Sequence, residues 1–138
     1  MKLSKEQEDH YLQQDEEKFV GLVVEHLQEE SPELIANLVD DSLREMIANG
    51  LKKARSYGIN TDAQLIGFVS IMFEIAPNFD EQPDIHKILS SDKIPANDKF
   101  ELIFGDAVSE EAWAEAENNY DEEAWFPELK EESQKQGS

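Results

Sequence analysis

Apolar residues recur at three- and four-residue spacing along most of this chain, and short polar stretches interrupt the period. The first such segment ends at Glu30, because Ser31-Pro32 follows it. Its apolar positions are Tyr11, Leu12, Phe19, Leu22, Val23 and Leu27. This spacing predicts one face of an amphipathic helix. The first ten residues lack an apolar stripe, so we expect them to fray.

Helix start and stop signals divide the rest of the chain. Ser31-Pro32-Glu33, Thr61-Asp62 and Ser109 each offer a capping side chain followed by a favourable first turn. Gly58 is the expected left-handed residue at the end of one helix, and Gly105 is the expected stop of another. Together these signals predict helices over 32–39, from the 40–42 cap to 57, and over 62–75, 83–89, 95–104 and 110–120.

The segment 62–75 is apolar on almost every side. Its apolar residues are Leu65, Ile66, Phe68, Val69, Ile71, Met72, Phe73 and Ile75. Its β-branched residues are also compatible with a buried strand, but its length and the cap at Thr61 favour a helix. A helix of this kind belongs in the middle of a bundle. The predicted fold class is therefore all-α, a compact bundle of about six or seven helices with a central hydrophobic helix.

The length of 138 residues fits one domain. We expect a single helical domain over 1–127 and a disordered acidic tail over 128–138, because the tail is polar and charged. The first residues lack the apolar run of a signal peptide, and no apolar stretch approaches a membrane span. The chain has no cysteine. A cytoplasmic protein without disulfides is therefore expected.

The net charge of the chain indicates which classes of partner it can bind. Thirty-two acidic residues against twelve basic ones give a formal net charge of −20. Nucleic acid and anionic membranes are polyanions, so we expect the chain to bind neither. A protein partner with a basic surface fits this charge, since acidic patches steer such encounters. The alternative is a solvated surface that only keeps the protein in solution.

Catalytic and metal-binding patterns are not recognisable. The three histidines, His10, His26 and His86, form no paired spacing typical of a metal site. Pro83 stands where a calcium loop beginning near Asn78 would need glycine. No nucleophile elbow, phosphate loop or dinucleotide fingerprint is present. We therefore expect no enzyme activity, no metal and no cofactor.

An acidic aromatic segment lies between Ser109 and Leu129, with eight acids and no lysine or arginine. Aromatic residues among acids suit a protein-binding edge, because tryptophan and tyrosine are frequent interface anchors. We expect Trp113 to pack into the core. For Trp125 and Phe126 we favour partner binding over the alternative, in which they fasten the tail to the bundle. The candidate partner-binding residues are Tyr120, Asp121, Glu122, Glu123, Trp125, Phe126 and, in a separate loop, Phe79 and Asp80.

Several short motifs follow one another in a fixed order over residues 19–83. They are Val24-Glu25-His26-Leu27, Ser31-Pro32-Glu33, Lys53-Ala54-Arg55, Tyr57-Gly58-Ile59, Met72-Phe73 and Pro77-Asn78-Phe79-Asp80. In this order and spacing, the tract resembles a family of small helical proteins encoded beside type VI secretion effectors. Two features depart from that pattern. Asn78 stands where the resemblance predicts an acid, and the acidic aromatic segment has no counterpart.

The resemblance implies a binding role without chemistry. Proteins of this kind look like accessory factors that work with an adaptor chaperone to stabilise an effector and load it onto the secretion spike. The alternative is an immunity protein that binds and neutralises a cognate antibacterial toxin. In either role the partner is a protein, namely an effector, an adaptor chaperone or a toxin.

Overall fold

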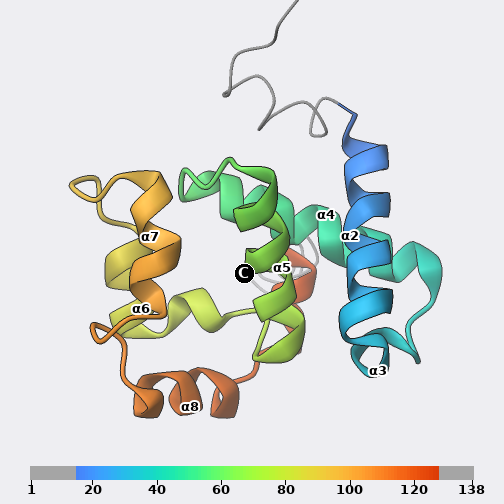
Figure 1. The fold of residues 1–138 in the computed structure, drawn as a ribbon. Coiled ribbons are helices and arrows are strands. Elements are labelled where there is room, and N and C mark those ends of the chain that lie inside the picture. Colours follow the sequence, from blue (N-terminus) through green and yellow to red (C-terminus); the bar gives the residue numbers. More distant parts are fainter. Residues whose placement is uncertain (1–14, 128–138) are drawn as a thin grey trace, which may run out of the picture. The chain divides into compact units, whose positions relative to one another are not determined.

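The computed structural model describes residues 15–127, and these form seven α-helices and two 3-10 helices without any strand (Figure 1). This result confirms the predicted all-α class and the predicted number of helices. The expected frayed start and the expected tail over 128–138 lie outside the described residues. The chain divides into two units, Met1–Ser70 and Ile71–Ser138, and each is described by itself. The single domain over 1–127 stays a prediction.

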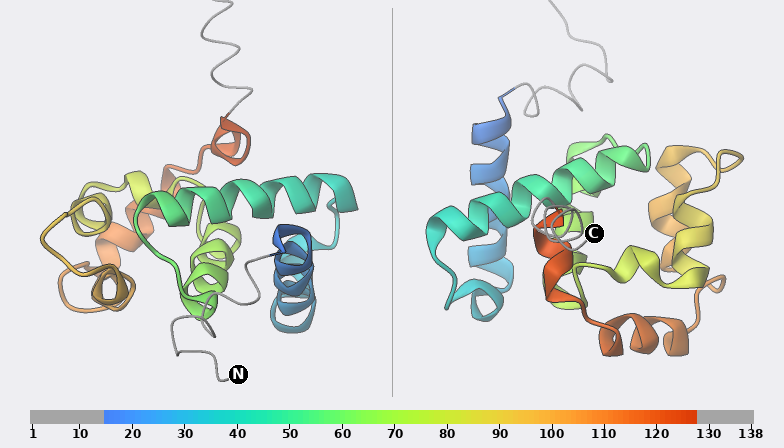
Figure 2. Two further views of the ribbon diagram at one scale, coloured as in Figure 1. Left: turned by 90° about the horizontal axis from the view of Figure 1, so that it is seen from above. Right: turned by 180° about the vertical axis from the view of Figure 1, so that it is seen from behind.

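In the first unit, α2 (Glu16–Glu30) is the helix that the spacing of apolar residues predicts. The side chain of Asp15 caps it by accepting a hydrogen bond from the backbone N–H of Lys18 at 3.2 Å. A short helix, α3 (Pro32–Ile35), follows the break at Ser31. The longer helix α4 (Asp40–Ser56) lies across α2 (Figure 2). The facing residues that are buried on α2 and α4 are Phe19, Val20, Val23, Val24, Leu27, Leu43, Met46, Ile47, Leu51 and Ala54.

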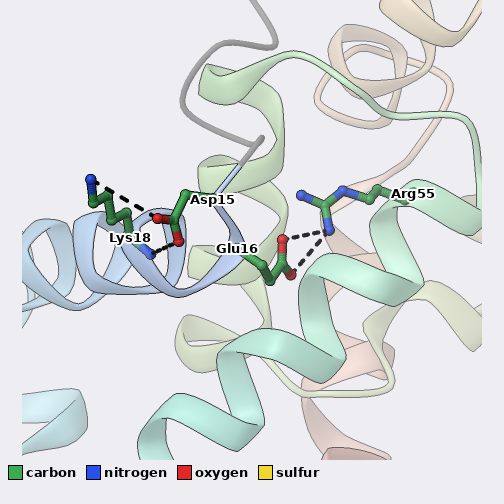
Figure 3. Close-up of polar contacts among 4 residues, drawn as sticks. All are labelled: Asp15, Glu16, Lys18 and Arg55. Atoms are coloured by element: carbon green, nitrogen blue, oxygen red, sulfur yellow. Dashed lines mark hydrogen bonds and ion pairs between the residues drawn. The ribbon is translucent and has the colours of Figure 1, made fainter.

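An ion pair joins the ends of these two helices (Figure 3). Nη1 of Arg55, in the last turn of α4, lies 3.1 Å from both carboxylate oxygens of Glu16, in the first turn of α2. Each charge also complements the dipole of its own helix end. Because both side chains are partly exposed, solvent screening limits the pair to about 0–1 kcal/mol of stability.

The turn after α4 requires glycine. Gly58 has a φ of 89°, in the left-handed region that side chains avoid. Its N–H donates to the carbonyl of Arg55 at 2.9 Å, and the next N–H, of Ile59, donates to that of Ala54 at 3.2 Å. Helix α5 (Asp62–Glu74) then begins, and Thr61 Oγ1 accepts a hydrogen bond from the N–H of Gln64 at 3.3 Å. The predicted stop and start signals are both confirmed.

The second unit contains the end of α5, η2 (Phe79–Glu81), α6 (Pro83–Leu89), α7 (Ala96–Ile103), α8 (Glu110–Asn118) and η3 (Glu122–Trp125). Helix α6 packs against η2 and α7, and α8 packs against η2. Ser109 caps α8 as predicted, since its Oγ accepts from the N–H of Ala112 at 3.1 Å. No helix within residues 15–127 is long and apolar enough to cross a membrane.

Two details of the predicted helices are wrong. Helix α3 ends at Ile35, and Val39 is 69% exposed at the cap position of α4, so the acids expected as caps lie inside the first turn instead. Leu102 on α7 and Phe104 at its C-cap are exposed, although apolar residues of an amphipathic helix are expected on its buried face. The buried residues of α7, Lys99 and Ile103, are four positions apart and so lie on one face of the helix. Leu102 and Phe104 lie outside that face.

Two glycine substitutions should change the stability of the protein in opposite directions, because the two glycines differ in backbone conformation. Gly21→Ala should stabilise the protein by about 0.5–1 kcal/mol, because alanine favours a helix interior. A Cβ at this position of α2 would have no atom within 4 Å. Gly58→Ala should destabilise it by about 1 kcal/mol, because its positive φ strains a side chain.

Chemical denaturation of both variants measures the two changes. Equal shifts in the same direction would show that the turn at Gly58 tolerates a side chain and would contradict the assigned backbone geometry.

Candidate functional site

A side-chain amide fixes the backbone at the start of the predicted binding edge. Asn78, 9% exposed, donates from Nδ2 to the carbonyl of Asn119 at 2.9 Å and accepts at Oδ1 from the N–H of Asp121 at 3.0 Å. An ionised carboxylate at this position would accept the second bond but could not donate the first. The resemblance predicts an acid here, and the segment that Asn78 holds is the one without a counterpart. The two features that depart from the resemblance, Asn78 and the acidic aromatic segment, therefore meet through these hydrogen bonds.

Trp125 lies in the interior of the second unit, 3% exposed. Its Nε1 donates to Oη of Tyr120 at 2.9 Å, and its ring centroid lies 4.5 Å from that of Phe73. A side chain with these contacts cannot also place its ring against a partner. The expectation that Trp125 is a contact residue is therefore wrong for this conformation, and the alternative, in which it fastens the chain after α8, fits the structure.

Other predicted contact residues near Trp125 stay accessible. Tyr120 is 51% exposed, and Glu122 and Glu123 are exposed on η3. Phe126 is half-buried, and so is Asp121, whose carboxylate caps η3 by accepting from the N–H of Glu123 at 3.1 Å. We call these five residues the acidic edge. Partner contact at the acidic edge stays a prediction.

The separate loop does not offer the anchor that we expected. Phe79 is fully buried, and Asp80 is buried beside it in η2. The ring of Phe79 stacks on that of Trp113 at 5.9 Å between centroids, so it belongs to the core. Neither side chain can meet a partner in this conformation, and the prediction that they do is wrong for it.

A small cavity of about 80 Å³ borders this loop and α8. It is well below the several hundred Å³ typical of small-molecule sites. The lining residues are Asn78, Glu81, Gln82, Pro83, Glu115, Ala116 and Asn119.

An aromatic ladder runs outward from Phe79, and sequence analysis missed it. Trp113 stacks on Phe104 at 5.5 Å with the planes 9° apart, and Phe104 meets the edge of Phe100 at 5.2 Å. Nε1 of Trp113 donates to the carbonyl of Ile103 at 3.2 Å, which holds the indole half-buried. The four-residue spacing of Phe100 and Phe104 was the available signal.

Metal ligands do not gather in the described part of the chain. Within residues 15–127, no group of three or more histidine, cysteine or acidic side chains is arranged to hold an ion. His26 is half-buried on α2 and His86 is exposed on α6, while His10 lies outside the described residues.

No family model, curated protein or solved structure matches this chain.

Replacing the amide of Asn78 tests its bridging role. Asn78→Asp should destabilise the second unit by about 1–3 kcal/mol, because the carbonyl of Asn119 loses its donor and faces a carboxylate. The indole N–H of Trp125 should also exchange faster with solvent, since the chain that carries its partner Tyr120 is less firmly held. Chemical denaturation and amide exchange measure the two effects.

Asn37→Asp, in an exposed turn of the first unit, is the matched control and should change the free energy of unfolding by less than about 0.5 kcal/mol. Similar effects of the two substitutions would exclude a specific bridge at Asn78.

Proposed function

We propose that this protein is a non-catalytic binding module of the bacterial cytoplasm, an accessory chaperone that helps to stabilise a type VI secretion effector and load it for export. The ordered motifs over residues 19–83 carry the proposal. The same residues and charge also fit the alternative role, an immunity protein that neutralises a cognate toxin. Both roles require a protein partner, and they differ in the outcome of binding.

The motif residues support the proposal through the positions that they occupy. Ser31-Pro32 stands at the start of α3, Gly58 at the left-handed turn before α5, and Phe79 in the core beside α8. These are positions that determine the path of the chain, where few residue types are tolerated. A likeness at such positions supports a shared fold, and the accessory role is inferred from that resemblance.

Charge supports a protein partner of a particular kind. From Phe100 to Pro127 the chain carries nine acids and no lysine or arginine. A surface of this sign attracts basic protein surfaces and speeds their encounter. The acidic edge offers Tyr120 and Phe126 as apolar contacts within that field.

Deletion of the gene separates the two roles. An accessory chaperone predicts less effector in the cell or in the secreted fraction, while the deleted strain still survives attack by its siblings. Effector level is measured by immunoblotting, and survival by competition against the parent strain. Normal delivery combined with sensitivity to siblings would instead establish the immunity role.

Single substitutions separate binding from stability at the acidic edge. Phe126→Ala should weaken capture of the co-expressed effector in a pull-down and leave the thermal melt nearly unchanged, because this ring is only half-buried. Trp125→Ala should cost about 3–5 kcal/mol of stability, because a buried ring is removed. Unaltered capture by the Phe126 variant would place the interface on another surface.

A further inference from the structure

Phe104 is the exposed ring of the aromatic ladder. It is 55% exposed, although it contacts both Phe100 and Trp113. Helix α7 buries Lys99 and Ile103 on one face. At about 100° per residue, Phe100 and Phe104 fall on one flank of that face, and the exposed Leu102 falls on the opposite flank. The three aromatic residues Phe100, Phe104 and Trp113 therefore form one continuous surface, which we call the aromatic face.

Acids surround the aromatic face. Helix α8 buries Ala112 and Ala116, and by the same periodicity Glu110 and Glu117 fall on the flank that carries Trp113. The other two glutamates of α8 fall on the opposite flank. Glu101 and Asp106 lie three and two positions from Phe104 in the chain, and all four of these acids are exposed. The exposed charged residues that α7 and α8 place beside the aromatic face are thus acidic.

We propose that the aromatic face is a docking surface for a basic protein segment, one with an apolar anchor flanked by arginine or lysine. The anchor would cover Phe104 and the exposed part of Trp113, and the flanking cations would meet the acids beside the aromatic face. The proposal rests on the proposed function, because it names the surface and the chemistry by which a protein partner would be held.

Three observations favour this occupant over bare solvent. Single exposed apolar side chains are common on any surface, but here the exposed ring continues inward through stacked rings to the fully buried Phe79. Rings held in this way lose little conformational freedom when a partner covers them. The absence of any lysine or arginine between Phe100 and Pro127 selects a cationic partner over an acidic one.

The chain has two tryptophans, and each reports on a different surface. Trp113 reports on the aromatic face and Trp125 on the acidic edge, so their two indole N–H signals in an NMR spectrum distinguish the surfaces. The probe is a synthetic helical peptide with leucines on one face and arginines on the other. We expect it to shift the Trp113 signal and to leave that of Trp125 in place.

Peptides of altered chemistry test the nature of the occupant. A peptide with glutamate for arginine, and one with serine for leucine, should each bind much more weakly than the first. Equal binding of either peptide overturns the proposal, and so does a response confined to Trp125 or no binding of the leucine–arginine peptide.

Matched variants of the protein test the residues. Phe104→Ala should weaken binding of the peptide by about 30-fold, the effect expected for a central aromatic anchor. Leu102→Ala, an exposed apolar residue on the opposite flank of α7, should change it by less than about twofold. An equal effect of the two substitutions overturns the assignment of the surface.

A second pair of variants changes the net charge of the protein by the same amount on opposite flanks of α8. Glu110→Gln with Glu117→Gln should weaken binding about fivefold, because these acids border Trp113. Glu111→Gln with Glu115→Gln removes the same charge from the opposite flank and should have less effect than about twofold. Equal losses would show attraction by net charge alone and overturn the proposal.

A deletion strain and a Phe104→Ala strain together distinguish an error in the docking surface from an error in the proposed function. If deletion of the gene lowers the effector level but Phe104→Ala does not, the accessory role stands and the aromatic face is the wrong surface. If the peptide binds as described but deletion leaves the effector level and its secretion intact, the docking surface stands and the accessory role is wrong. A lowered effector level in both strains supports both proposals.

Discussion

The second unit depends on a side chain that can donate and accept at the same time. Asn78 stands between α5 and α6, and its amide holds the backbone on both sides of Tyr120, more than forty residues further along. That contact decides where the chain goes after α8. It therefore also decides that Trp125 returns to Phe73 and that the acidic edge is presented where it is. A carboxylate could supply only half of this contact.

The two tryptophans illustrate how similar residues acquire different roles. Trp125 satisfies its indole N–H through Tyr120 and is covered completely. Trp113 satisfies its own through a backbone carbonyl at the end of α7 and stays partly open beside Phe104. Aromatic composition alone suggested one binding segment, with Trp125 as its anchor. The structure instead buries Trp125 and leaves the rings of Trp113 and Phe104 partly exposed, while the acids on both surfaces share one sign.

The sequence predicted the helices well because their boundaries depend on local contacts. The caps at Thr61 and Ser109 and the turn at Gly58 each involve residues within a few positions of one another. Burial was harder to predict, because it depends on partners far away in the chain. Phe104 and Leu102 have the apolar character of core residues but lie outside the buried face of α7. Their exposure follows from how α7 packs on α6, which no local pattern encodes.

The boundary between the two units falls inside α5, and this affects how such a chain can be divided. Leu65, Phe68 and Val69 precede the boundary, and Ile71 and Met72 follow it, so buried side chains of one unbroken helix belong to both units. A break at Ser70 would leave two short pieces of helix, each below the length at which a helix persists alone in water. Division of the chain at Ser70 would therefore cost both pieces the helix that carries these buried side chains.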